Sequence, residues 1–352
     1  MGGWQTGGDI NSNVNDVTGI WEHLTGLKDD PLGSALGLGA DFIGFGQAFG
    51  SAAAPLFDAT TFAEAAATPV INAGLMVLMG MGNLSGLGTP DRGQDFGSGA
   101  DAFARIGETL ATTDAPASWT GDGSAAYTGQ NGIQQDRARA MRELDRSVSE
   151  VLAQEGEQVA DTRQTIDHCA TALTFAIPMA VYLNTIPYVG PATSLEYQLI
   201  AVSATLPLAQ ARFLQMTVES AQNATLVRQA GAGYDRIGSE PDPVTPTGSG
   251  DVSVASADLV RLSSQQGEVA THIASAGLTT QETTQNVWFS HGLVCAPTNA
   301  AVTGAVASRG AAAGTMQAAS TVLASRLDSS AAVYDNTDQQ QQGQVDGQMH
   351  PR

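Results

Sequence analysis

The chain has 352 residues, of which only 14% are charged, and its formal net charge is −20. This length allows two or three small domains. The composition argues against nucleic-acid binding, because no basic stripe is available to neutralise phosphates, and the negative charge disfavours anionic lipid surfaces. The amino terminus lacks a basic region followed by an apolar run. We therefore predict no Sec signal peptide, and a protein that is cytosolic or exported by a route that reads folded features.

Residues 1–68 are rich in Gly and Ala with scattered Phe, and we predict a loosely packed extension here. The stretches 68–90 and 169–195 are apolar and uncharged, but Gly residues interrupt the first and Pro residues the second. A spanning helix needs about 20 residues of sustained apolarity. The sequence therefore allows membrane contact but does not predict a transmembrane span.

A helical hairpin is predicted around Trp119-x-Gly121. Before this corner, apolar residues from Phe96 to Leu110 are spaced by seven, three and four positions, which places them on one helix face. The Gly permits backbone angles that other residues resist, and the indole ring is suited to plug the open end between two antiparallel helices. We therefore interpret Trp119 and Gly121 as the hairpin turn.

The second arm is predicted to be one long helix from Gly123 to Ile177, roughly 80 Å long at a rise of ~1.5 Å per residue. Its apolar residues recur every three or four positions, as in a coiled coil. These apolar residues form a seam along one side of the helix, and Glu155 is the one charged residue near it. Other charges, such as Asp145, are expected elsewhere around the helix. Pro178 is expected to break or kink the helix. The seam residues are Met141, Leu144, Val148, Val151, Leu152, Val159, Ile166, Cys169 and Leu173.

A further helix is predicted over 192–230, kinked by Pro207 and packed back on the long helix in a small bundle. Three Pro and three Gly residues over 238–250, with almost no apolar side chain, indicate a linker. A second helix–loop–helix unit follows, with helices over 256–276 and 298–334. The predicted order is an extension (1–68), a helical domain (69–237), the linker (238–250), a helical hairpin (251–338) and a disordered Gln-rich tail (339–352).

Several short segments between 70 and 230 carry a resemblance to a known family. Over this range the chain resembles the mycobacterial ESX (type VII) secretion-associated proteins of the EspA/EspE type. Proteins of the EspA type carry a stronger apolar segment after the Ile-Pro turn, whereas this chain has Glu196, Pro207 and Arg212 there. The marks are Trp119-x-Gly121, Gly123–Ala126 with Tyr127, Gln130-Asn131, Leu144-Asp145-Arg146, Thr162-Arg163 and Ile186-Pro187-x-Val189-Gly190.

Residues 252–338 look like the small EspC-type partners of that family. The marks here are Ser290-His291-Gly292-x-x-Cys295 at the loop and the run from Tyr334 to Asp338 after the last helix. The two types ordinarily occur as separate chains, whereas here they are joined.

The resemblance implies an export signal, because a Tyr-x-x-x-Asp/Glu behind a helical hairpin is the general signal of ESX substrates. Of the six tyrosines, only Tyr334 has an acid four residues later, which is Asp338. This spacing puts the two side chains one turn apart on the same helix face. The alternative is a solvated helix end with an ordinary core tyrosine.

No group of residues indicates catalysis. His291 and Cys295 are spaced as one edge of a metal site and His168 with Cys169 as another, but adjacent helical residues point about 100° apart and zinc takes four converging ligands. We predict no metal, no cofactor and no enzyme activity. Cys169 and Cys295 either form a disulfide, within or between chains, or are two small buried hydrophobes.

We therefore predict an all-α, non-enzymatic protein that acts in type VII secretion by helical protein–protein assembly, at the cell envelope or outside the cell. Its expected partners are proteins of the ESX secretion machinery and further copies of itself. We also expect the two helical domains to dock on each other, because tethering raises their effective concentration. The alternative is a cytosolic adaptor or chaperone for other ESX substrates.

Overall fold

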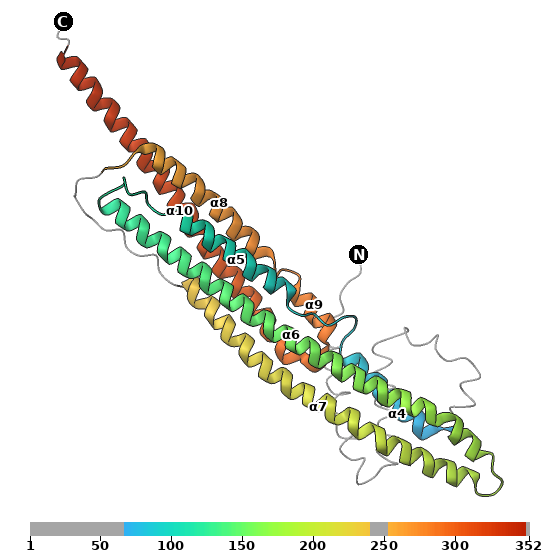
Figure 1. Cartoon of the computed structure of the whole chain (residues 1–352). Helices are drawn as coiled ribbons and strands as arrows, with labels where there is room; N and C mark the ends of the chain where they lie inside the picture. Colours follow the sequence, from blue (N-terminus) through green and yellow to red (C-terminus); the bar gives the residue numbers. More distant parts are fainter. Residues whose placement is uncertain (1–66, 240–252, 350–352) are drawn as a thin grey trace, which may run out of the picture. The chain divides into compact units, whose positions relative to one another are not determined.

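The computed structural model describes residues 67–239 and 253–349, which are almost entirely helical (Figure 1). The predicted all-α class is confirmed: within these ranges there is no strand, only one isolated bridge between Thr120 and Ser253. Nearly all of the predicted extension, 1–68, and most of the predicted linker, 238–250, lie outside the described residues.

The predicted helices are present in the predicted order, and the structure adds two short helices, α4 and α9, that were not predicted. A short helix and the first hairpin arm precede two long helices, and a second set of helices follows the linker. The elements are α4 (Pro69–Leu84), α5 (Gln94–Thr112), α6 (Asp122–Asn184), α7 (Gly190–Ser239), α8 (Ser256–Leu278), α9 (Thr283–His291), the 3₁₀ turn η2 (Leu293–Cys295) and α10 (Ala296–Met349).

The described residues fall into two compact units, each built from segments that are distant in the sequence. The helices α6 and α7 are continuous, and each contributes residues to both units. Unit 1 takes its described residues from Met1–Thr89, Glu157–Val218 and His291–Val294, and unit 2 from Pro90–Gly156, Glu219–Ser290 and Cys295–Arg352.

Helix α6 is longer than predicted. It has 63 residues, which corresponds to about 95 Å, and it continues through Pro178 to Asn184. The helix therefore does not break at this proline, and the kink that we gave as the other outcome stays a prediction. Proline removes one backbone hydrogen bond from a helix interior. The buried side chains of Ala176 and Ala180, on either side, hold this stretch in the core of unit 1. Packing therefore compensates for the lost bond.

The core of unit 1 is formed by α4, α6 and α7. Gly74 of α4 lies so close to the other two helices that an added Cβ would be 3.1 Å from Leu173 and 3.2 Å from Val202. This close approach explains why a glycine occupies the middle of a helix. The buried core residues are Ile71, Val77, Leu78, Met81, Ile166, Cys169, Leu173, Ala176, Ala180, Leu206 and Ala209.

The core of unit 2 combines α5, the first part of α6 and the last part of α7 with α8, α9 and α10. Helices α8 and α10 lie side by side (Figure 1), and α5 also packs on α8. One contiguous apolar cluster includes Phe103 of α5, Met141 of α6, Tyr234 of α7, Ile273 of α8 and Val302 of α10. Segments before and after the linker therefore share a single core.

Helix α10 extends well beyond Tyr334, where we predicted its end. Its bounds run to Met349, while the disorder predicted for the stretch 339–352 stays a prediction. Residues 335–345 are all exposed, and Gln is a good helix former. This end of the helix is therefore held by its own backbone hydrogen bonds and not by packing.

Candidate functional site

The connection between α5 and α6 places an aromatic pair at one end of unit 2. Trp119 lies in this connection, and Gly121 has φ 101°, a value that favours glycine. The Trp119 ring stacks at a tilt on Tyr127 of α6, with 5.4 Å between ring centroids. We name the group around this pair the corner cluster: Trp119, Tyr127, Leu259, Leu262, Leu323, Leu327 and Ala331, with Tyr334 packed against it.

A cavity of about 540 Å³ opens beside the corner cluster. Trp119 and Tyr127 line one part of it, and Leu323, Arg326 and Tyr334 of α10 line another. Tyr334 is half-buried, whereas Asp338, one turn later, is exposed. The two residues of the predicted export signal thus differ in environment, because the tyrosine contacts the cluster while the carboxylate faces solvent.

A buried hydrogen-bond network lies next to the corner cluster, at the end of α5. The Tyr127 hydroxyl donates to the Thr113 carbonyl (2.6 Å), and the Asn131 amide donates to the Leu110 carbonyl (3.0 Å), so both side chains satisfy carbonyls at the end of α5. The Gln266 amide of α8 reaches the Tyr127 hydroxyl (3.2 Å). Burial raises the pKa of Tyr127, and the nearby Asp114 raises it further. The phenol is therefore kept neutral as a donor.

An ion pair lies in the middle of unit 2 and joins segments before and after the linker. The guanidinium of Arg309 on α10 binds Asp145 on α6 through two parallel hydrogen bonds, Nε to Oδ1 (2.7 Å) and Nη2 to Oδ2 (2.8 Å). Both side chains are fully buried. The Tyr234 hydroxyl of α7 donates to the same carboxylate at 2.7 Å. Three helices therefore converge on one buried carboxylate.

Every donor of the Arg309 guanidinium has an acceptor. Besides the two bonds to Asp145, Nη1 donates to the Gly277 carbonyl and to Thr280, both at 3.3 Å, and Nη2 donates to Thr279 at 3.2 Å. The guanidinium also lies 5.4 Å from the centroid of the Phe103 ring, within cation–π range. A fully satisfied buried pair of this kind fixes the register of its helices, because any slip would leave a charge unpaired.

Burial changes the pKa values of Asp145 and Tyr234. It raises the pKa of Asp145 above the ordinary value, while the hydrogen bond and the electrostatic attraction from Arg309 oppose this shift. The pKa of Tyr234 is raised strongly, first by burial and then by the adjacent Asp145 carboxylate. Gly99 of α5 leaves room for the pair, since a methyl group there would overlap Arg309 Nη2 and Asp145 Oδ2.

Sequence reasoning missed these polar residues. We placed Asp145 among the charges outside the seam, but it is buried, and Arg309 and Gln266 were not singled out. One signal was available for Arg309, because it is a lone charge between Ala296 and Ser325 in an Ala-rich helix. A buried arginine needs a carboxylate partner, but the sequence does not say which acid meets it.

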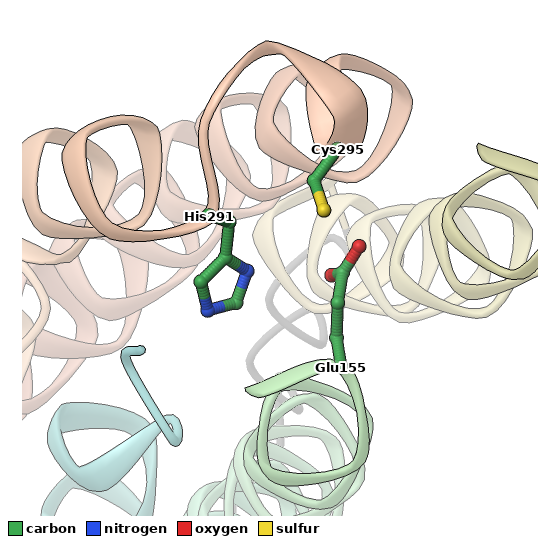
Figure 2. A group of neighbouring side chains, drawn as sticks. All are labelled: Glu155, His291 and Cys295. Carbon is green, nitrogen blue, oxygen red and sulfur yellow. The ribbon is translucent and has the colours of Figure 1, made fainter. Parts of the chain in front are cut away.

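The cysteines are both buried, Cys169 in unit 1 and Cys295 in unit 2. Burial raises the pKa of the Cys169 thiol, which lowers the thiolate fraction. Figure 2 shows the Glu155 carboxylate pointing toward the Cys295 thiol; both residues belong to unit 2, and their nearest ligand atoms lie within 4.8 Å of each other. His291 is buried at the end of α9 and belongs to unit 1. Two donors do not define a zinc site.

Two family models match this chain, one on each side of the linker. The EspA/EspE family matches residues 85–168, which hold α5, the connection with Trp119 and most of α6. The model described as excreted virulence factor EspC, type VII ESX diderm, matches residues 249–347, which hold α8 to α10. The predicted resemblance is confirmed: the chain joins an EspA/EspE-like region to an EspC-like region.

The chain is similar to proteins that are named as ESX-1 secretion-associated proteins. The ESX-1 secretion-associated protein EspE of Mycolicibacterium smegmatis is 33% identical over 182 residues, which are 52% of this chain and 35% of that protein. The ESX-1 secretion-associated protein EspA of Mycobacterium tuberculosis is 26% identical over 156 residues, 44% of this chain and 40% of that protein. The matches thus span well under half of these relatives. No solved structure matches the chain.

Proposed function

We propose that this protein is a non-enzymatic substrate of a type VII (ESX) secretion system that acts by helical assembly at the cell envelope or outside the cell. The observation that carries the proposal is that this chain contains both family regions. The similar proteins are named as secretion-associated proteins and not as enzymes. The partners that follow are proteins of the ESX secretion machinery.

Tyr334 and Asp338 are the proposed export signal. Tyr334 is anchored at the corner cluster beside the cavity that Trp119 also lines, so its ring has a fixed position. Asp338 is exposed one turn later and makes a carboxylate available to a receptor. In this interpretation the Trp119-x-Gly121 corner and the signal form one recognition surface on unit 2.

Export from a host with an active ESX system tests the proposal. Tyr334→Ala and Asp338→Asn should each shift the protein from the envelope and culture fluid to the cytosol. Asp335→Asn is the matched control, because this exposed acid lies outside the motif, and its export should not change. Asp338→Asn also separates a lost signal from misfolding, since its side chain is not packed.

Two results would argue against this function. Unchanged export of both motif variants would remove the signal. Retention of the unmodified protein in the cytosol would instead favour the alternative, an adaptor or chaperone for other ESX substrates, because such a protein stays inside the cell whichever residue occupies position 334.

We further propose that the EspA/EspE-like and EspC-like regions are docked on each other within one chain. The bond between Arg309 and Asp145, the bond between Gln266 and Tyr127, and the shared corner cluster support this arrangement. Tethering replaces a two-chain association by an intramolecular one at higher effective concentration.

Self-association is the remaining part of the proposal. The surface of α10 has few charges and many Ala residues, which suits close helix packing between copies. It also exposes the apolar side chains of Val322 and Val333. Light scattering coupled to size exclusion measures the oligomer directly, and a monomer at all concentrations would remove this part.

A further inference from the structure

One end of unit 1 is almost free of charge. Helix α4 has no charged side chain, and between Asp167 and Arg212 the only Asp, Glu, Lys or Arg is Glu196. The chain as a whole carries a formal net charge of −20, so this low charge is a local property. We name α4 together with 168–211 the apolar end.

Large apolar side chains are exposed on all three helices of the apolar end. Phe175 is 79% exposed, Ile200 60% and Tyr188, at the turn between α6 and α7, fully exposed. Because each of the three helices exposes apolar side chains and also buries others in the shared core, the exposed apolar residues are not confined to one helix. The other exposed members are Met76, Met79, Met179, Tyr182, Val189, Leu195, Leu199 and Leu208.

Several hydroxyl groups on these helices donate to the backbone of their own helix. Thr174 donates to the Ala170 carbonyl (2.8 Å), Thr193 to that of Val189 (3.0 Å) and Ser203 to that of Ile200 (2.9 Å). A hydroxyl bonded to its own helix backbone is already satisfied in an environment without water. These polar side chains therefore do not prevent the helices from leaving solvent.

A charged collar bounds the apolar end at one level. Arg212 of α7 donates from Nε to Asp161 of α6 at 2.8 Å. The Arg163 guanidinium of α6 donates to the Ser85 carbonyl, just after α4, at 3.0 and 2.8 Å. These bonds join α6 to α7 and to the residue that follows α4, so the charged groups of α6 and α7 begin close together at this end of the three helices.

The length of the apolar end suits a lipid bilayer. From the collar to the turn, 168–184 rises about 25 Å and 190–211 about 33 Å, against a hydrocarbon thickness of about 30 Å. Among the residues that the structure describes, α6 is the one helix long and apolar enough to cross a membrane by length and composition. Glu196 lies in the second turn of α7, near the tip and not midway.

We propose that the apolar end of unit 1 inserts into the hydrocarbon core of a lipid bilayer, with the Tyr188 turn leading. A second copy would cover one face of a three-helix bundle, whereas lipid covers every side of it. Since the end is uncharged and the chain is acidic, neutral lipid is the fitting surface and salt should not weaken binding. The proposal goes beyond the secretion role and does not depend on export.

Flotation of the purified full chain with neutral phosphatidylcholine vesicles tests the proposal. The protein should float with the vesicles at low and at high salt, and added anionic lipid should reduce the bound fraction. Ile200→Glu and Leu208→Glu should each lower partitioning at least about tenfold, because a carboxylate in hydrocarbon is costly. Circular dichroism of the variants confirms that these exposed positions leave the fold intact.

Matched substitutions on unit 2 separate insertion from a general effect of added charge. Val260 is 52% and Leu278 65% exposed, and Val260→Glu and Leu278→Glu should float as the unmodified protein does. Equal losses for both pairs would overturn the proposal, as would absence of flotation. It would also be overturned if the unmodified chain were a non-floating oligomer that Ile200→Glu converts to monomer, since the apolar end would then be a contact between copies.

Discussion

At the scale of single residues, the most informative group is the buried pair of Arg309 and Asp145. Removing one partner of a buried ion pair leaves the other charge without compensation. We expect Arg309→Met to lower the free energy of unfolding of the chain by about 3–5 kcal/mol. Chemical denaturation of the purified protein measures this loss.

Apolar replacement of the whole group should restore most of that stability. The triple change Arg309→Met, Asp145→Leu and Tyr234→Phe removes both charges and the hydroxyl that binds them, and such exchanges are often neutral. Arg139→Met is the surface control: its pair with Asp136 is mostly exposed, so the cost should stay below about 1 kcal/mol. A triple variant less stable than Arg309→Met would contradict this account of the pair.

The buried tyrosines predict a loss of stability at alkaline pH. Burial raises the pKa of Tyr127 in the folded chain, whereas an unfolded tyrosine titrates near ~10. Its contribution is therefore complete below about pH 10, and above it the unfolded chain releases a proton that the folded chain keeps, so the free energy of unfolding falls as pH rises.

Tyr127→Phe should make that alkaline decline shallower, by up to about 1.4 kcal/mol per pH unit. Denaturation curves at a series of pH values on both sides of 10 measure the slope. Tyr188→Phe is the control, because Tyr188 is fully exposed, and it should leave the slope as it is. An unchanged slope in Tyr127→Phe would show that this phenol is not held neutral.

The thiols give a further test at this scale. Cys169 and Cys295 are both buried, so we expect neither to react with a thiol reagent until the chain unfolds, and then both to react. Mass spectrometry after labelling counts the modified residues. Absence of labelling in the unfolded, unreduced chain would favour the disulfide that the sequence left open.

At the scale of elements, the sequence was informative wherever a pattern is local. The three- and four-residue spacing of apolar side chains predicted α5, α6 and α8, because a helix that buries one face has apolar residues at this spacing in successive turns. The ends of helices were harder, as at Pro178 and Tyr334, since tertiary packing or helix propensity can extend a helix past a local stop signal. The pairing of Arg309 with Asp145 was not predictable, because it depends on which helices meet.

The last turns of α10 should contribute little to stability. Residues 335–345 are exposed, so deleting 339–352 should change the free energy of unfolding by no more than about 0.5 kcal/mol, while helical circular dichroism decreases. Asp338 remains in this variant, so the proposed export signal is kept. A large loss of stability would mean that the tail packs on the rest of the chain.

At the scale of the whole molecule, two family regions that resemble separate proteins occur in one chain. Unit 2 draws on both, since α5 and part of α6 share its core with α8 and α10. The resemblance could be predicted from short motifs such as Trp119-x-Gly121 and the Tyr334 to Asp338 run. Which residues of the two regions meet in the shared core could not be predicted, because contacts between distant segments produce no periodic pattern in a single sequence.

The most direct test of this account is to cut the chain between the two regions. A specific protease site inserted after Thr247, within the predicted linker, allows cleavage of the folded protein. We predict that the two fragments then elute together in size exclusion, and that Arg309→Met weakens their association while Arg139→Met does not. Separate elution of folded fragments from the otherwise unmodified chain would contradict the docked arrangement.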